Sequence, residues 1–173
     1  IIKLSPGSPH CINVKDIRPV DTHVDRFLNE IEEEPSYLAE KIDNLIGFFT
    51  LLMPEKTNVE EQLLDEALIN TYAKKGITHD NDSLWDADRP GEYREMPILE
   101  NLRDELLKSP RAEKLAIIIN RFVDGSAKAF NGQTNIKLDN KYMVFDISKL
   151  KGRMLNAGLD VAFDFIWSKA KEN

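Results

Sequence analysis

The sequence has a single cysteine, Cys11, and lacks any apolar run that approaches the length of a membrane helix. One cysteine excludes an internal disulfide bond and suits a reducing cytoplasm. A transmembrane helix needs about 20 apolar residues in succession, so we expect no transmembrane segment. The sequence opens with IIKL, which is neither a methionine start nor a signal peptide. This start predicts that the chain begins inside a longer protein.

Nucleotide-binding motifs are missing as well. The sequence contains neither the GxxxxGK[ST] phosphate loop nor the GxGxxG fingerprint. Its nearest glycine-bearing loop, residues 5–9, has one glycine and is not followed by a lysine. A phosphate loop and an acidic strand position the nucleotide and its Mg²⁺. We therefore expect no catalytic residue, no cofactor-binding residue and no metal ligand in this chain.

Charge is distributed unevenly along the chain, whose net charge is −7. Residues 21–124 carry 24 acidic and 12 basic residues, a net charge of −12. Residues 1–20 carry three basic and one acidic residue, and residues 125–173 carry eight basic and five acidic residues. An acidic surface repels phosphate groups, so the middle part is expected to bind nucleic acid poorly. It fits either a solvated helical surface or a surface that docks another protein.

Two helices are predicted at the start of this acidic middle part, in a chain whose 42% hydrophobic residues are typical of an ordered domain. The first covers residues 36–53, where apolar side chains recur at helical spacing until Pro54. The second begins with the capping-box spacing of Thr57 and Glu60 and ends at Gly76. We expect the two helices to form an antiparallel hairpin.

Two more helices are predicted between Pro97 and Gly125, separated by Ser109 and Pro110. Short strands and a last helix are expected outside this part, at residues 1–4, 136–138, 142–147 and 153–171. The side chains expected to face inward on the last helix are Leu155, Leu159, Phe163, Ile166 and Trp167.

The strand over residues 142–147 is expected to be buried on both faces, because its residues 142–145 are apolar without alternation. Strand-bearing ends therefore flank four helices. A short core strand at each end would otherwise leave backbone groups unpaired. The pattern predicts a mostly helical chain with a few short strands, in which a helical subdomain is inserted into an α/β core that continues outside this sequence.

Two groups of residues have the composition of metal ligands but not the spacing. His10 and Cys11 are adjacent and His23 follows twelve residues later, which is a poor arrangement for zinc and leaves a Cys/His dyad without an orienting group. A second group has the composition of a calcium loop: Asp80, Asp82, Asp86 and Asp88. In that loop Leu84 and Trp85 occupy positions that calcium binding reserves for a ligand and a glycine. Ordinary loop roles are the simpler interpretation of both groups.

Trp85, Tyr93 and Arg94 lie in a long polar loop, residues 76–95. Tryptophan, tyrosine and arginine are common anchors of protein interfaces, so these residues are candidates for contact with a partner. The alternative is that Trp85 folds back onto the helices of its own chain.

Three stretches of the sequence together resemble one family. They are IIKLSPGSPHCINVKDI, GITHDNDSLWDADRPGEYREMPILENLRDEL and GSAKAFNGQTNIKLDNKYMVFDISKLKGRMLNAGLDVAFDFIW. In content and order they resemble the conjugation ATPases of type IV secretion systems, the VirB-four/TraC/TrbE/TraE-like family. The most specific parts are FNGQTN, residues 130–135, and FDISKL, residues 145–150. The first stretch departs from the family, which usually has NP[LF]DI where this chain has NVKDI, residues 13–17.

The resemblance implies a RecA-like P-loop NTPase core with a helical subdomain inserted between its phosphate loop and its acidic magnesium strand. Residues 1–20 and 126–173 would be partial core elements, and residues 21–125 would be the acidic helical insertion. ATP and Mg²⁺ would be bound by the intact parent protein outside this chain. The parent is expected to hydrolyse ATP for secretion-channel assembly or for DNA or protein export. It would work as an oligomer, with a hexamer as one form, at the cytoplasmic face of the cell membrane.

Two classes of function follow from this resemblance. In the first, the parent is an ATPase and this segment packs on the motor and regulates it. In the second, the acidic helices dock other components of the secretion channel, and the chain is a non-catalytic interaction module.

The charge distribution generates a first testable prediction. Duplex DNA should bind the chain weakly and without sequence specificity, because the middle part repels phosphate. A mobility-shift assay in about 150 mM salt checks this. A complete shift at submicromolar protein would contradict it.

Overall fold

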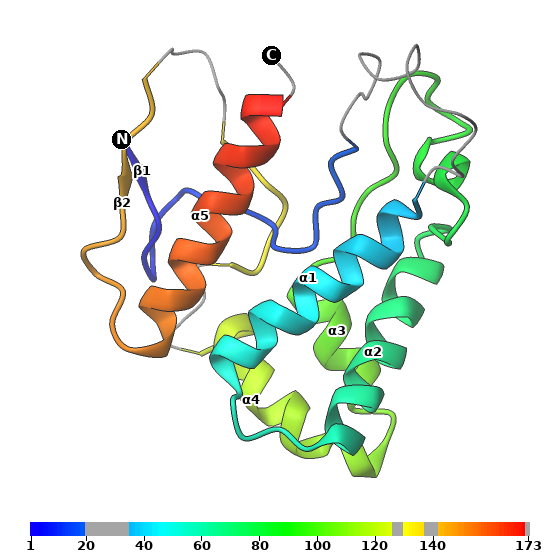
Figure 1. Ribbon diagram of the computed structural model, residues 1–173, viewed down its shortest axis with the longest axis horizontal. Helices are drawn as coiled ribbons and strands as arrows, with labels where there is room; N and C mark the ends of the chain where they lie inside the picture. Colours follow the sequence, from blue (N-terminus) through cyan, green and yellow to red (C-terminus); the bar gives the residue numbers. More distant parts are fainter. Residues whose placement is uncertain (20–34, 126–129, 137–141, 172–173) are drawn as a thin grey trace.

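The computed structural model of the chain describes residues 1–19, 35–125, 130–136 and 142–171 (Figure 1). This described part is mostly helical and contains two short strands. In chain order the elements are β1 (Ile2–Lys3), α1 (Tyr37–Leu52), α2 (Asn58–Ala73), η1 (Asn81–Leu84), α3 (Leu99–Leu106), η2 (Pro110–Ala112), α4 (Glu113–Val123), β2 (Phe145–Asp146) and α5 (Arg153–Lys171), where η marks a 3₁₀ helix.

The ends of α1 and α2 lie where the sequence places them. The Ser36 side chain accepts a hydrogen bond from the backbone N–H of Ala39 and caps α1. Thr57 and Glu60 form the predicted capping box at the start of α2, with reciprocal backbone and side-chain hydrogen bonds. Gly76 has a φ of 79°, a left-handed conformation that glycine adopts without a Cβ clash, and the chain leaves α2 there.

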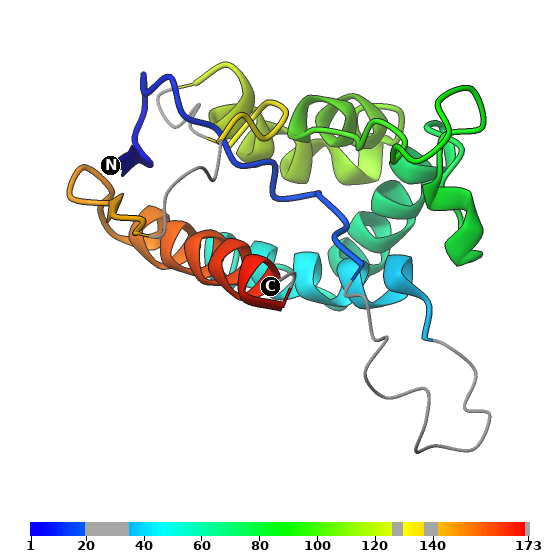
Figure 2. The same ribbon diagram turned by 90° about the horizontal axis from the view of Figure 1, so that it is seen from above.

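The helices α1 to α4 share one apolar core, as the helical spacing predicts. Helix α3 packs mainly on α4 and on α2, and α1 contacts both α2 and α5. Figure 2 shows that the N-terminal segment, drawn in blue, runs between a layer that contains α1 and α5 and a layer that contains α3 and α4. The N-terminal segment is therefore part of the core, which buries its side chains Ile2, Leu4, Ile12, Val14 and Ile17.

β1 and β2 lie in two of the segments where strands are expected and form a parallel pair, with Ile2 opposite Phe145 and Lys3 opposite Asp146. The pair is shorter than expected: each strand has two residues in the structure. The expected strand over residues 136–138 is not observed at Ile136, and residues 137–141 lie outside the described part of the chain.

Two side chains correct the expectation of a strand buried on both faces. Tyr142 is 91% exposed and Val144 is 58% exposed, while the alternate residues Met143 and Phe145 pack against the core. One face of this segment is therefore covered by the described residues and the other is not. The division into core elements at residues 1–20 and 126–173 and an insertion at 21–125 stays a prediction.

The side of α5 that packs against the core also differs from the side that was expected to do so. Phe163, Ile166 and Trp167 were expected inside but are 65%, 39% and 65% exposed, and Leu155 and Leu159 are half-buried. The side that packs inward consists of Met154, Ala157, Gly158, Val161, Ala162 and Phe165. Small residues on this side let the helix approach the core closely, so Gly158 fits against Leu150, where even a Cβ would clash. Ranking side chains by size alone therefore selects the wrong face.

The corrected orientation of α5 predicts how two phenylalanines differ. Phe165 is 1% exposed and its ring meets that of Phe145 edge-on, with centroids 6.0 Å apart. Phe165→Ala should lower the free energy of unfolding by about 3–5 kcal/mol, because it leaves a cavity in the core. The matched variant Phe163→Ala should change it by less than about 0.5 kcal/mol, because this ring faces solvent in the chain. Urea denaturation measures both, and the reverse ranking would show that the core is misplaced.

Candidate interaction surfaces

A network of side-chain amides and a hydroxyl joins three separate segments of the chain. We call it the polar clasp, and its members are Asn13, Asn131, Gln133, Thr134 and Asn135. Asn135 accepts a hydrogen bond from the backbone N–H of Cys11 at 2.8 Å and donates one to the carbonyl of Pro9 at 2.7 Å. Thr134 Oγ1 accepts from the backbone N–H of Asn13 at 2.9 Å. The loop of residues 130–136 thereby holds the N-terminal segment along much of its length.

Asn13 lies at the centre of the clasp and is 1% exposed. Its Nδ2 donates to the carbonyl of Pro97 at 3.1 Å and to Gln133 Oε1 at 3.3 Å, and its Oδ1 accepts from the backbone N–H of Lys15 at 3.0 Å. Gln133 Nε2 in turn donates to the carbonyl of Met96 at 2.8 Å. One buried amide thus connects the N-terminal segment, the loop before α3 and the 130–136 loop. The FNGQTN stretch, whose role the sequence left open, forms this structural joint.

Lys15 is buried directly behind Asn13, with no exposed surface. Its Nζ donates to Thr71 Oγ1 and lies 5.0 Å from the centroid of the Tyr72 ring. The Tyr72 hydroxyl donates to the carbonyl of Lys15 at 2.5 Å. Burial lowers the pKa of Lys15 well below its ordinary value, because a charged ammonium loses its hydration there. These contacts attach the N-terminal segment to α2.

Charged side chains connect the same segment to α5. Asp16 accepts from Thr134 Oγ1 at 2.5 Å and pairs with Arg18 at 2.9 Å, and the Arg18 guanidinium lies 4.7 Å from the centroid of Phe165. On α1, the buried Lys41 pairs with Asp164 of α5 at 3.4 Å. Burial lowers the pKa of Lys41, and the neighbouring Asp164 opposes that shift. The group holds α1, α5 and the N-terminal segment together.

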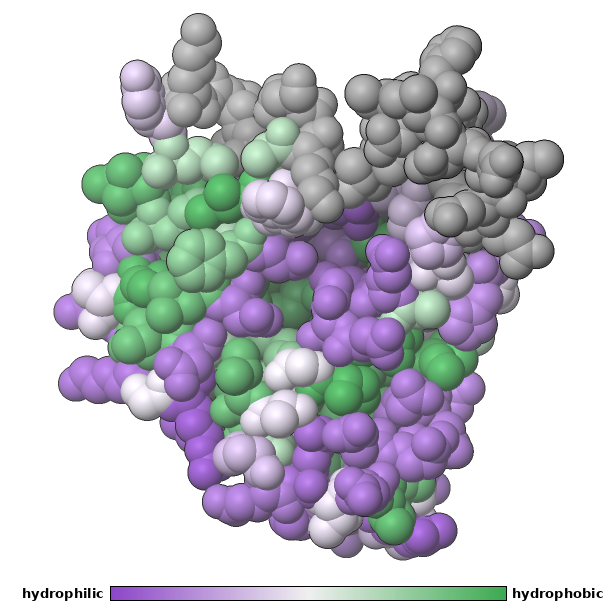
Figure 3. All heavy atoms as spheres, viewed as in Figure 1, coloured by the Kyte–Doolittle hydropathy of each residue, from purple (hydrophilic) through white to green (hydrophobic). Residues whose placement is uncertain are grey.

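The outward side of α5 is a candidate interaction surface. We call it the outer face of α5 and define it by Phe163, Ile166 and Trp167. These three side chains line a groove of about 750 Å³ between α1 and α5, in which Leu51 of α1 is also exposed. Figure 3 shows apolar residues gathered over the part of the molecule that holds α5 and the strand pair. Contiguous exposed apolar surface of this kind marks places where proteins bind other protein surfaces.

The strand pair beside α5 is also exposed. Within the described residues β1 and β2 pair with no further strand, and the backbone N–H of Lys3 in β1 donates to His10 instead. The neighbouring side chains Ile1, Tyr142 and Val144 are strongly exposed. Unpaired strand edges are commonly covered by further strands. The outer face of α5 and the strand pair together form one candidate interaction surface.

The structure does not bring the suspected metal ligands together. His10 Nδ1 accepts a hydrogen bond from the backbone N–H of Lys3 at 3.2 Å, and Cys11 sits in the clasp with its pKa raised to about 11, chiefly by burial. His23 lies outside the described residues. Among the described residues, no three His, Cys, Asp or Glu side chains are placed to hold a metal ion. The group at Asp80 to Asp88 forms local turns instead: Asp80 caps η1 and Asp86 pairs with Arg89 at 2.7 Å.

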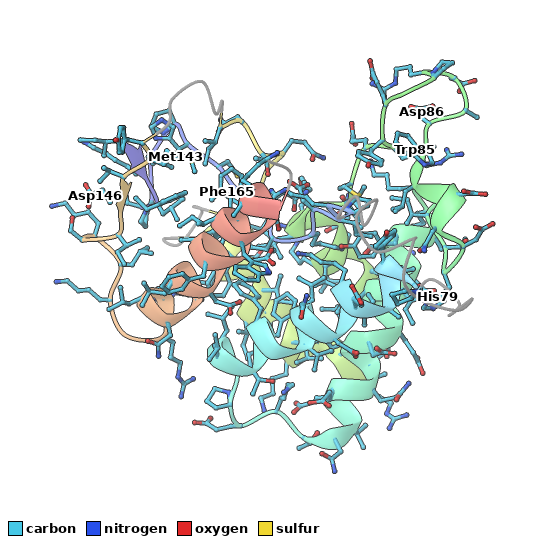
Figure 4. All side chains as sticks on the ribbon, turned by 45° about the horizontal axis from the view of Figure 1, so that its top comes forward. His79, Trp85, Asp86, Met143, Asp146 and Phe165 are labelled. Atoms are coloured by element: carbon cyan, nitrogen blue, oxygen red, sulfur yellow. The ribbon has the colours of Figure 1, made fainter. Side chains whose placement is uncertain are left out.

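The loop with Trp85 and Tyr93 is a second exposed surface. Their rings stack with centroids 4.4 Å apart, and their backbones form an antiparallel bridge. Both rings stay partly exposed, at 46% and 41%. Figure 4 shows Trp85 and Asp86 in a loop that projects far from Met143 and Asp146 at the strand end. Trp85 therefore packs on its own loop rather than on the helical core, while Arg94 donates to the carbonyl of Ser83 at 3.0 Å.

The described residues do not fit an ATP–Mg²⁺ site. The turn at residues 5–9 closes on itself through a hydrogen bond from the backbone N–H of Ser8 to the carbonyl of Ser5 at 3.0 Å. No lysine follows this turn in the way that a phosphate loop requires.

No helix in the described part of the chain is both long enough and apolar enough to cross a membrane.

The fold matches a solved structure, that of VirB4 of Thermoanaerobacter pseudethanolicus. The match covers 99% of this chain with a TM-score of 0.78 and 24% sequence identity. It covers 62% of that chain, so this chain spans less than two thirds of the VirB4 structure. No protein-family model and no curated protein matches the sequence. The likeness establishes the fold, and it confirms the resemblance to VirB4-type proteins that the three sequence stretches indicate.

The buried Lys15 generates a prediction about pH. Because burial lowers its pKa in the folded protein, the unfolded chain binds more protons at pH values just below the ordinary lysine pKa. The free energy of unfolding should therefore rise with pH toward the ordinary lysine pKa of 10.5, by up to about 1.4 kcal/mol per pH unit. Lys15→Met should remove this contribution, so the wild-type chain should gain stability relative to the variant as the pH approaches the ordinary lysine pKa, between about pH 8.5 and about pH 10. Urea denaturation at both pH values checks this, and parallel pH dependences would contradict it.

Proposed function

We propose that this chain is a segment of the ATP-driven motor of a type IV secretion system. The observation that carries the proposal is the match to VirB4 along 99% of the chain. A second observation supports it: the outer face of α5 and the strand edges are exposed in the chain. Such surface is expected when a segment is separated from the core that it belongs to.

In this proposal β1, β2 and α5 belong to a RecA-like core, and α1 to α4 form a helical body inserted into it. The parallel pairing of β1 with β2 supports this, because parallel strands are typical of sheets covered by helices on both faces. ATP and Mg²⁺ are bound by the parent protein through a phosphate loop and an acidic strand outside this chain. When bound, they supply the phosphoryl-transfer chemistry that powers the motor.

The residues of this chain act by positioning rather than by chemistry. The polar clasp joins the N-terminal segment to the loop before α3, and the pair of Lys41 with Asp164 joins α1 to α5. A displacement of the core elements would therefore be transmitted to the helical body instead of being absorbed in a flexible hinge. The segment regulates the motor through these contacts.

The parent protein would work as an oligomer, hexameric in one form, at the inner face of the cell membrane. It would power channel assembly or the export of DNA or protein during conjugation. The second candidate function, a non-catalytic module that docks other channel components, is favoured by one feature: the Trp85–Tyr93 pair that projects from the acidic helical body. The two functions are compatible within one parent protein.

ATP turnover tests the first of these functions. A longer version of the protein that includes both flanking regions should hydrolyse ATP in the presence of Mg²⁺, whereas the 173-residue chain should neither bind nor hydrolyse it. Single-turnover assays and calorimetry measure both properties. Micromolar, Mg²⁺-dependent ATP binding by the 173-residue chain would contradict the proposal, and so would a longer protein without turnover.

A further inference from the structure

A second groove shares no lining residue with the groove beside the outer face of α5. It has a volume of about 650 Å³ and is formed by the turn between α1 and α2, by α4 and by the first residues of α5. Its floor is apolar, with the buried side chains Leu52, Met53, Leu115, Phe122 and Met154. Ile117 of α4 also lines it and is 65% exposed. The groove therefore offers apolar surface that the described residues leave uncovered.

The groove is lined by more basic than acidic side chains. The basic residues in its lining are Lys56, Lys114, Arg121, Lys151 and Arg153, and the acidic ones are Glu55 and Glu60. This local excess of positive charge stands out because residues 21–124 carry 24 acidic and 12 basic residues. Three of the five cations already have acidic partners: Lys56 pairs with Glu61 at 2.9 Å, Lys114 with Glu60 at 3.3 Å, and Arg153 with Glu55 at 3.2 Å.

The other two cations give the groove its uncompensated charge. The exposed side chains of Arg121 and Lys151 form no ion pair or hydrogen bond with the described residues. Arg121 comes from α4, and Lys151 lies just before α5. Two unpaired positive charges thus border an apolar floor from different elements. An exposed cation is well hydrated, so its position beside apolar surface stabilises the chain little by itself.

The apolar floor and the charged rim, which contains Arg121 and Lys151, together determine which class of ligand fits the groove. A nucleic acid backbone is a poor match, because the floor offers apolar side chains rather than hydrogen-bond donors for phosphate and sugar groups. A neutral apolar helix would leave Arg121 and Lys151 without partners. An amphipathic segment with carboxylates beside its apolar side satisfies both the floor and the rim.

We propose that this groove is a docking site for an acidic, amphipathic segment of a partner protein. Apolar side chains of the partner pack on the floor next to Ile117. Its carboxylates pair with Arg121 and Lys151 at the rim. The site is separate from the outer face of α5, so a partner can bind here while the rest of the parent protein covers that face.

Fluorescence anisotropy with a labelled synthetic peptide tests the proposal. The probe is a peptide of about 16 residues with Leu at the three- and four-residue spacing of one helix face and Glu on the flanks of that face. The chain should bind it, and the affinity should fall as salt rises, because the rim charges are solvent-exposed. A second peptide with Gln in place of Glu should bind about tenfold more weakly.

Variants of the chain locate the binding. Arg121→Glu combined with Lys151→Glu should weaken binding of the Glu probe about tenfold or more, and Ile117→Ser should also weaken it. The matched control is Arg111→Glu combined with Lys149→Glu, which makes the same change in net charge at exposed positions outside the groove lining. The control should bind like the wild type. Circular dichroism should show the same folded signal for all variants, because each substituted side chain is exposed.

Three outcomes would overturn the proposal: no binding of the Glu probe by the wild-type chain, equal loss of binding in the groove variant and its control, or equal binding of single-stranded oligothymidine. The second would reduce the effect to overall charge, and the third would assign the groove to nucleic acid. None of them bears on ATP turnover by a longer protein, so this proposal and the proposed function fail separately.

Discussion

The buried amide of Asn13 is the constraint on which the arrangement of this chain depends. It bonds at once to the carbonyl of Pro97, to Gln133 and to the backbone of Lys15, so three segments far apart in sequence meet at one side chain. A buried polar network is stable only when every member has a partner. Among the described residues, no buried side-chain nitrogen or oxygen atom lacks one. The helical body and the strand-bearing ends are thereby joined through directional bonds, which fix their relative position more narrowly than apolar packing does.

Helix α5 carries apolar side chains on two sides because it serves two contacts. Its inner side consists largely of small residues such as Ala157 and Gly158, which approach the core closely. Its outer face presents large side chains, Phe163 and Trp167 among them, that the described chain leaves exposed. In a self-contained domain such a helix would be an aggregation hazard. In the segment of a larger motor that we propose, exposed apolar side chains on this face are the expected result.

Much of this fold is predictable from local sequence patterns. Helical spacing, the Thr57–Glu60 capping box and Gly76 gave α1 and α2 correctly, since caps and periodicity are local properties. The positions of the two paired strands were also expected, although the apolar run at residues 142–145 wrongly indicated burial on both faces. The clasp did not follow, because which amide pairs with which carbonyl depends on contacts more than 80 residues apart in sequence. The inward side of α5 was missed because apolar side chains occur at helical spacing on two sides of this helix, so the spacing alone did not distinguish them. The unpaired positive charges of the second groove come from Arg121 in α4 and from Lys151 near the start of α5. No single stretch of sequence therefore predicts this groove.

The central claim is that the outer face of α5 is covered by the rest of the parent motor. Hydroxyl-radical labelling read by mass spectrometry tests it directly, on the 173-residue chain and on a longer protein with both flanking regions. Trp167 and Phe163 should be labelled readily in the chain, where each is 65% exposed, and should be protected in the longer protein. Trp85, at 46% exposure in a projecting loop, serves as the internal reference and should be labelled in both. Equal labelling of Trp167 in the two proteins would contradict the account.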